Sequence, residues 1–124
     1  MLTVTPDRTL AAPTPSPEYF DGAVFMQPLV SKNHSSELEM IAVFFEDGAR
    51  TIPHTHSTDQ VLLVVSGHIV VADVDGRREL AAGDLAHVPA GRWHWHGAVS
   101  GHSACHISIR KPGPSDWSLP RRDW

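Results

Sequence analysis

The stretch that decides the fold runs from residue 48 to residue 67 and reads GARTIPHTHSTDQVLLVVSG. Two histidines separated by one residue follow the first glycine, and a mostly apolar run leads to the last one. Residues two apart on an extended strand project from the same face, so His54 and His56 can direct both imidazoles to one point. Gln60 has the same parity. Two ring nitrogens and one amide oxygen can therefore meet one ion.

A second stretch, residues 83–98, repeats the His-x-His spacing and reads GDLAHVPAGRWHWHGA. The same parity places His94 and His96 on one face of a strand and Trp93 and Trp95 on the other. If two sheets close face to face, four histidines line one interior. Divalent metals of the first transition row bind imidazole readily, and a mixed nitrogen and oxygen donor set with open positions suits catalysis. The two stretches together predict a metal centre.

Both stretches resemble the motifs of the cupin superfamily. The first motif is Gly, five residues, His-x-His, three or four residues, Glu, six residues and Gly, and residues 48–67 keep this spacing with Gln60 in the Glu place. The second motif is Gly, five residues, Pro-x-Gly, two residues, His, three residues and Asn. It is matched by Gly83, Pro89, Gly91 and His94, with Ala98 in the Asn place. The resemblance implies an all-β fold, the cupin double-stranded β-helix or jelly-roll barrel, with metal ligands His54, His56, Gln60 and His94.

The last apolar run, residues 105–110, alternates so that His106 falls on one face of its strand. His96 and His106 can then face the cavity without binding the metal, which suits a general base and a hydrogen-bond donor. Thr51, shortly before the first histidine pair, can add a hydroxyl near the metal. These three residues form the predicted catalytic group.

A narrower resemblance covers residues 16–117. The stretches SPEYFDGAV (16–24), GART (48–51), HWHGA (94–98) and DW (116–117), together with Gln60 and His106, look like the bacterial cupins that include the manganese-dependent hydroxynitrile lyases and cupins related to carboxymuconolactone decarboxylase proteins. The resemblance implies a divalent transition metal, with manganese expected and iron, nickel, zinc or cobalt as alternatives. It gives assisting roles to Thr51, His96 and His106. The implied reaction is reversible addition of cyanide, or of another stabilised carbanion, to an aldehyde. Pocket linings expected from the sequence are Val61, Leu63, Val65 and Trp93.

Gln60 has chemical consequences because a Gln amide, unlike the usual Glu, brings no negative charge to the ion. The ion then keeps its full charge and stabilises an alkoxide or enolate more strongly. The residues leave several functions open: a carbon-carbon lyase, a quercetinase-type dioxygenase, a metal-dependent cyclase or isomerase, and a small-molecule sensor or storage cupin. A degenerate cupin without metal is a further interpretation of Gln60.

Short apolar runs separated by turn residues predict a domain made of strands. The predicted strands are residues 23–30, 38–45, 60–66, 69–73, 78–81, 85–88, 93–99 and 105–110. The dipeptide Asp75-Gly76 between two of them predicts a tight hairpin. Three regions are expected: an N-terminal arm over residues 1–17, flexible or extended along the barrel, the cupin barrel over 18–111, and an irregular tail over 112–124 docked through Trp117 and Trp124.

The composition and net charge of the chain indicate which classes of binding partner to expect. The 124 residues are 41% hydrophobic and 19% charged with a formal net charge of -4, so we expect a small-molecule substrate and neither nucleic acid nor a membrane as partner. The start of the chain lacks the apolar region of a secretion signal, which favours the cytoplasm. A homodimer or a higher homo-oligomer is expected. The single cysteine, Cys105, is expected to be a packed thiol. No role is assigned to His34, His68, His87 or His102.

Overall fold

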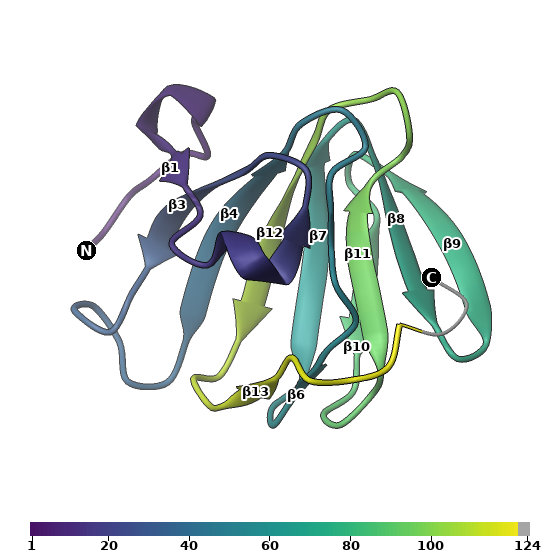
Figure 1. Ribbon diagram of the computed structural model, residues 1–124. Helices are drawn as coiled ribbons and strands as arrows, with labels where there is room; N and C mark the ends of the chain where they lie inside the picture. The colour runs from purple at the N-terminus through teal and green to yellow at the C-terminus, as the bar shows by residue number, and fades with distance from the viewer. Residues whose placement is uncertain (122–124) are drawn as a thin grey trace.

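The computed structural model describes residues 1–121 as two antiparallel sheets packed face to face, with a small third sheet at one end (Figure 1). The six-stranded sheet contains, in spatial order, β1 (Ala12–Pro13), β3 (Val24–Val30), β4 (Glu39–Phe45), β12 (Ala104–Arg110), β7 (Gln60–Ser66) and β10 (Leu85–Val88). The five-stranded sheet contains β2 (Phe20–Asp21), β5 (Arg50–Thr51), β11 (His94–Ala98), β8 (His68–Asp73) and β9 (Gly76–Ala81). The third sheet pairs β13 (Ser115–Asp116) with β6 (Thr55–His56).

The all-β barrel is confirmed. Every long strand expected from the sequence is present, and the predicted hairpin joins β8 to β9, whose last register pair is Asp73 with Gly76. The remaining regular structure consists of two-residue strands and two 3-10 turns, η1 (Arg8–Leu10) and η2 (Pro17–Tyr19). No helix in residues 1–121 is long and apolar enough to cross a membrane.

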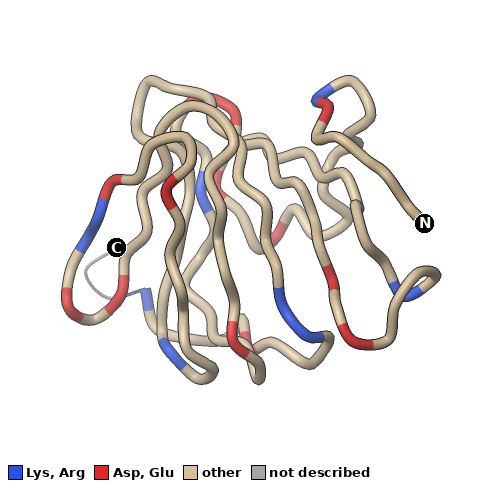
Figure 2. The backbone as a smooth tube through the Cα atoms, turned by 180° about the vertical axis from the view of Figure 1, so that it is seen from behind, with Lys and Arg blue, Asp and Glu red and all other residues tan. Residues whose placement is uncertain are grey.

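The interior of the barrel changes character along its length. Near one end the inward side chains form an apolar cluster of Val24, Val43, Phe45, Ala49, Val64, Ile69, Ala98 and Ala104. Further along, polar side chains join apolar ones on the inward face, because β12 contributes His106, Ser108 and Arg110 at alternate positions. Figure 2 shows that acidic and basic residues otherwise fall mostly in loops and near strand ends. The apolar end supplies burial energy, and the polar end is left for chemistry.

Residues 1–17 run along the edge of the six-stranded sheet, where β1 pairs with β3. The side chain of Gln27 on β3 accepts a hydrogen bond from the backbone N–H of Asp7 at 2.8 Å and donates one to the carbonyl of Thr5 at 3.1 Å. The guanidinium of Arg8 lies 3.5 Å from the centre of the Phe25 ring. The N-terminal segment is thus bonded to the barrel by backbone pairing and side-chain contacts together.

A glycine allows the close approach of β5 to β11. Gly97 pairs with Arg50, and a Cβ atom at position 97 would lie only 2.3 Å from the Cβ of Arg50. On the outer face beside it, Trp95 is buried under the guanidinium groups of Arg50 and Arg77, at 4.5 and 5.0 Å from its ring. His94 and His96 consequently face inward, as their parity predicts.

Candidate metal centre and its cavity

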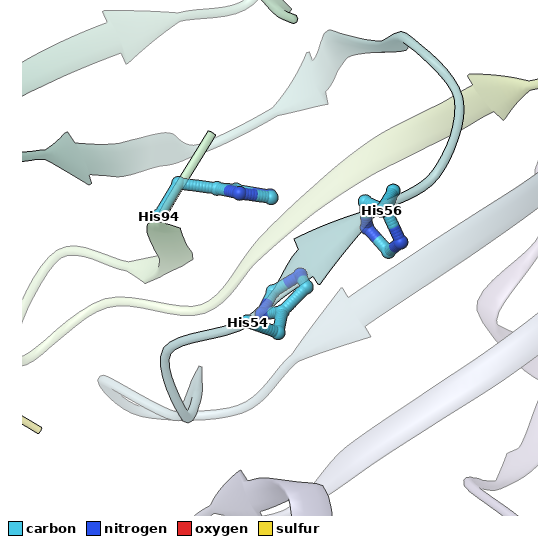
Figure 3. Close-up of side chains that lie close together, drawn as sticks. All are labelled: His54, His56 and His94. Atoms are coloured by element: carbon cyan, nitrogen blue, oxygen red, sulfur yellow. The ribbon is translucent and has the colours of Figure 1, made fainter. Parts of the chain in front are cut away.

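Three buried histidines converge inside the barrel. Ring nitrogens of His54, His56 and His94 all lie within 4.8 Å of one another (Figure 3). His54 and His94 also form an isolated β-bridge, with backbone hydrogen bonds of 2.9 and 3.1 Å in the two directions. The first histidine pair and one member of the second are therefore brought together by backbone geometry.

Backbone carbonyls fix the tautomers of two of these rings. The Nδ1 atom of His54 lies 2.8 Å from the carbonyl oxygen of Ile52, and Nδ1 of His94 lies 2.9 Å from that of Arg92. A carbonyl oxygen only accepts hydrogen bonds, so each Nδ1 must carry the proton. The Nε2 atom of each neutral ring is left with a lone pair, which is the form that binds a metal.

Gln60 adds an oxygen to the same point. Its Nε2 donates to Ser108 Oγ at 2.9 Å, which leaves Oε1 only 3.1 Å from Nε2 of His94. Both of these facing atoms carry lone pairs and neither carries a proton. Such a contact is unfavourable unless a cation lies beside both atoms. The two facing lone pairs of Gln60 and His94 therefore fit a bound metal ion.

His56 also has a buried ring nitrogen that fits a bound metal ion. Its Nδ1 lies 2.6 Å from Ser115 Oγ, while its Nε2 is buried and has no hydrogen-bond partner among residues 1–121. A buried polar nitrogen without a partner is costly, and a metal ion removes that cost. The donor set of three imidazoles and one amide oxygen matches a divalent transition ion better than calcium or magnesium, which prefer oxygen ligands alone.

Burial keeps these rings neutral. The pKa of His54 lies well below its ordinary value because the ring is buried and because His94 is close to it. Burial, together with the charge of Arg110, lowers the pKa of His56 to about 3. Burial also lowers the pKa of His94. The site therefore presents unprotonated imidazoles at neutral pH, as metal binding requires.

The other histidine of the second pair faces a different partner. The Nδ1 atom of His96 lies 2.9 Å from Nε2 of His106, and the backbone N–H of His96 donates to Thr51 Oγ1 at 3.1 Å. Burial, followed by the nearby His106, holds the pKa of His96 well below its ordinary value. Burial lowers the pKa of His106 to about 3. Thr51 and His96 line the cavity, whereas His106 is fully buried behind His96. The expectation that His106 faces the cavity is thus corrected.

The cavity beside these histidines has a volume of about 220 Å³. Terminal segments cover part of it. Trp117 stacks on Tyr19 with ring centres 4.4 Å apart and on His54 with ring centres 4.0 Å apart. Trp117 docks the tail as expected, although the tail also contains β13, and Trp124 lies outside the described residues.

The residues expected to line the pocket do not line it. Val61, Leu63 and Val65 alternate with the buried Gln60, Leu62 and Val64, so they project from the opposite face of β7. Trp93 instead donates from its indole nitrogen to the carbonyl of Pro120. The apolar walls come from Phe20, Met26, Ile41, Val43 and Trp117. Of the other histidines, His34 and His87 bond Ser31 and Asp59 at exposed positions, and His68 lies near His102.

Sequence reasoning missed two features of the cavity. Arg110 and Glu39 line it as a charged pair with 3.6 Å between Nε and Oε1. Arg110 has the same parity as His106 on β12, a signal that could have placed it inside. Ser115 and Tyr19 reach the site through the folded positions of the two terminal segments, and no local pattern indicates this.

Comparison with known proteins agrees with the fold. Residues 41–109 match the cupin domain family, and the chain belongs to this family. It is 33% identical over 95 residues to an (R)-mandelonitrile lyase of Granulicella tundricola, over 76% of this chain and 72% of that protein. This chain is thus a cupin, and one of its relatives is named as a lyase.

Solved structures show the same architecture. A cupin-like protein from Thermotoga maritima superposes with a TM-score of 0.76 at 33% identity, covering 81% of this chain and 79% of that one. The polyketide cyclase RemF from Streptomyces resistomycificus reaches 0.78 over 98% and 89% of the two chains. Its identity is 15%, so this second likeness is one of fold.

Proposed function

We propose that this cupin is a metal-dependent lyase that breaks or forms a carbon-carbon bond at a carbon carrying a hydroxyl or carbonyl oxygen. The observation that carries the proposal is the His96–His106 pair beside the His54, His56, His94 group. A neutral histidine beside three histidines that could hold a metal ion supports a base acting next to a metal in one cavity. The likeness to a protein named as a mandelonitrile lyase supports the same reaction type.

The residues that would hold the metal are His54, His56, His94 and Gln60, with manganese as the expected ion. A divalent ion bound there polarises the oxygen of a hydroxyl or carbonyl group. The donors themselves add no negative charge, so they do not weaken the attraction of the site for an oxygen that gains charge.

His96 would move the proton. When its Nδ1–H donates to His106, the Nε2 atom of His96 has a free lone pair and can accept the hydroxyl proton of a cyanohydrin. The electrons of that O–H bond form the carbonyl as the bond to the cyano carbon breaks, and cyanide leaves with the bonding pair. Cyanide then takes the proton from His96, so one cyanohydrin gives one aldehyde and one hydrogen cyanide.

The hydrogen bond between the two histidines suits this exchange. Once Nε2 of His96 has accepted the substrate proton, the proton on its Nδ1 can shift across the 2.9 Å to Nε2 of His106, which leaves His96 neutral with an N–H donor toward the cavity. Thr51 accepts from the backbone of His96, so its own hydroxyl proton remains available to the substrate. Positioned groups of this kind contribute roughly 10² to 10⁴ in rate.

The direct test is aldehyde and cyanide release from mandelonitrile by metal-replete protein. Equal amounts of both products are expected, with loss of release after chelation. An oxygen electrode runs beside the assay, since oxygen consumption without cyanide release would contradict the lyase and favour a dioxygenase.

The substitution Gln60→Glu also tests the lyase against the dioxygenase. The carboxylate should hold a divalent ion at least as tightly, but lyase turnover should fall because the added negative charge opposes a developing anion. Undiminished lyase turnover with metal retained would refute this charge argument.

We also propose that the protein acts in the cytoplasm as a homodimer or a higher homo-oligomer on a small-molecule substrate. Light scattering coupled to size exclusion measures the mass against the 13.6 kDa of one chain. A mass of one chain at working concentration would contradict the oligomer.

A further inference from the structure

An ion pair and a neutral amide lie side by side on three neighbouring strands, next to the candidate metal donors. Arg110 on β12 is the register partner of Gln60 on β7 and of Glu39 on β4. All three side chains line the cavity. The guanidinium therefore lies one strand away from the amide that faces His94, and the proposed proton transfer uses neither Arg110 nor Glu39.

The guanidinium of Arg110 has few hydrogen-bond partners for a largely buried cation. Its side chain is only 13% exposed. Within residues 1–121 it makes one hydrogen bond, from Nη1 to the carbonyl of Gly113 at 3.2 Å. The 3.6 Å separation from Glu39 is too long for a hydrogen bond. An arginine has five N–H donors in a planar fork, so donors remain for an acceptor that residues 1–121 do not supply.

Within this ion pair, the charge of Glu39 is more exposed to solvent than the charge of Arg110. Its side chain is 34% exposed, so solvent screens its charge more than that of Arg110. Glu39 is also the only acidic residue among the described cavity-lining residues. With neutral histidines and Gln60, the inner part of the cavity attracts anions, and a bound divalent ion increases that attraction.

A hydroxyl on the same strand completes the recognition group. Ser108 lies two residues before Arg110 and lines the same cavity. Its Oγ accepts the hydrogen bond of Gln60 Nε2, so its own proton can be donated to a ligand. An arginine fork beside a hydroxyl donor suits a carboxylate, whose two oxygens accept in one plane.

We propose that Arg110, assisted by Ser108, binds a carboxylate group of the substrate. The substrate class is then a small 2-hydroxy or carbonyl compound that carries a carboxylate close to the reacting carbon, with an apolar group against Ile41 and Met26. The inference rests on the proposed function in placing the substrate in this cavity, but the binding it predicts is measurable without turnover.

Mandelate and mandelamide are the probes, because they share one shape and differ in charge. Isothermal titration of the metal-replete protein and of the chelated protein gives both dissociation constants. Mandelate should bind at least about tenfold more tightly than mandelamide, as one charge-assisted hydrogen-bonded contact provides. Arg110→Met should reduce that ratio to near one in the chelated protein. In the metal-replete protein the ion itself attracts the carboxylate, so the ratio should fall there without reaching one. Arg78→Met, which removes the same charge from the exposed strand β9, should leave the ratio unchanged.

Glu39→Gln tests the proposal in the opposite direction and removes no group of the carboxylate site. It frees Arg110 from its competing acid, so mandelate should bind several-fold more tightly while mandelamide changes little. An unchanged ratio in Arg110→Met, or in Glu39→Gln if Arg110→Met does not fold, would overturn the proposal. A chain that binds mandelate selectively but releases no cyanide would retain this inference and lose the lyase. Cyanide release without charge selectivity would do the reverse.

Discussion

The two His-x-His pairs have the same spacing and different surroundings. In the first pair both rings face the common point, and Ser115 contacts Nδ1 of His56 from the C-terminal tail. In the second pair only His94 faces that point, while Nδ1 of His96 lies against His106. The same parity therefore yields two candidate metal donors in one segment, and in the other one candidate donor and one ring that bonds to a different histidine.

The difference comes from the neighbouring strand. Behind His96, β12 places His106, which gives the ring a hydrogen-bond partner and holds it away from the donor group. His54 and His94 instead donate to carbonyls of residues two positions earlier in their own chain segments, which points their free nitrogens inward. The group that bonds to Nδ1 thus sets the direction in which the free Nε2 atom of each ring points.

The largest expected effect is on metal content. His54→Ala or His56→Ala removes a donor, and these variants should keep less than about a tenth of the wild-type metal after dialysis. His96→Ala should keep it all. Elemental analysis of the purified variants gives the answer, and metal loss from His96→Ala would show that the second pair resembles the first.

Turnover should show the opposite dependence on the second pair. His96→Ala should lower cyanide release by about 10² to 10⁴ with metal retained, as expected for a lost general base. The rate is measured on protein of confirmed metal content. Turnover close to wild type would remove His96 from the proton path and leave the two pairs distinguished by structure alone.

A smaller effect is expected where Gln60 is oriented. Ser108→Ala removes the acceptor that turns the amide oxygen toward His94, so metal affinity should fall by about 10- to 100-fold, as for other residues that orient metal ligands. Competition with a chelator measures the affinity. Ser66→Ala, at the exposed end of β7, is the matched control, and equal affinities in the two variants would contradict the orienting role.

Acid should give the smallest effect, through His106. Its pKa of about 3 lies below the ordinary histidine value, so between about pH 6 and pH 4 the unfolded chain binds one proton there that the folded chain does not. The stability due to this group is present above pH 6.5 and is lost as pH falls toward 3. His106→Leu should therefore reduce the slope of unfolding free energy by about 1.4 kcal/mol per pH unit. Urea unfolding of chelated protein at several pH values measures it, and equal slopes would place the His106 ring in contact with water.

Much of the barrel could be predicted because its long strands carry their own pattern. Alternation and turn dipeptides located the strands, and parity placed His54, His56 and His94 on inward faces. The two-residue strands β2, β5 and β13 were not predictable, since two residues have no period and exist only because a neighbour pairs with them.

The sequence also did not predict how deep inside the barrel each inward side chain lies. Parity assigns a face, but it does not say that His106 lies behind His96 while Ser108 on the same face reaches the cavity. That depends on the crossing of two sheets. Trp117 on His54 likewise joins residues far apart in sequence, so only the folded chain shows it.

The backbone bridge between His54 and His94 has a consequence for metal supply. Because peptide groups hold these two histidines in place, this part of the candidate site is positioned when the barrel folds. If a metal binds there, we expect one ion to be exchangeable for another in the intact protein. The metal recovered from cells would accordingly record which ions were abundant during growth.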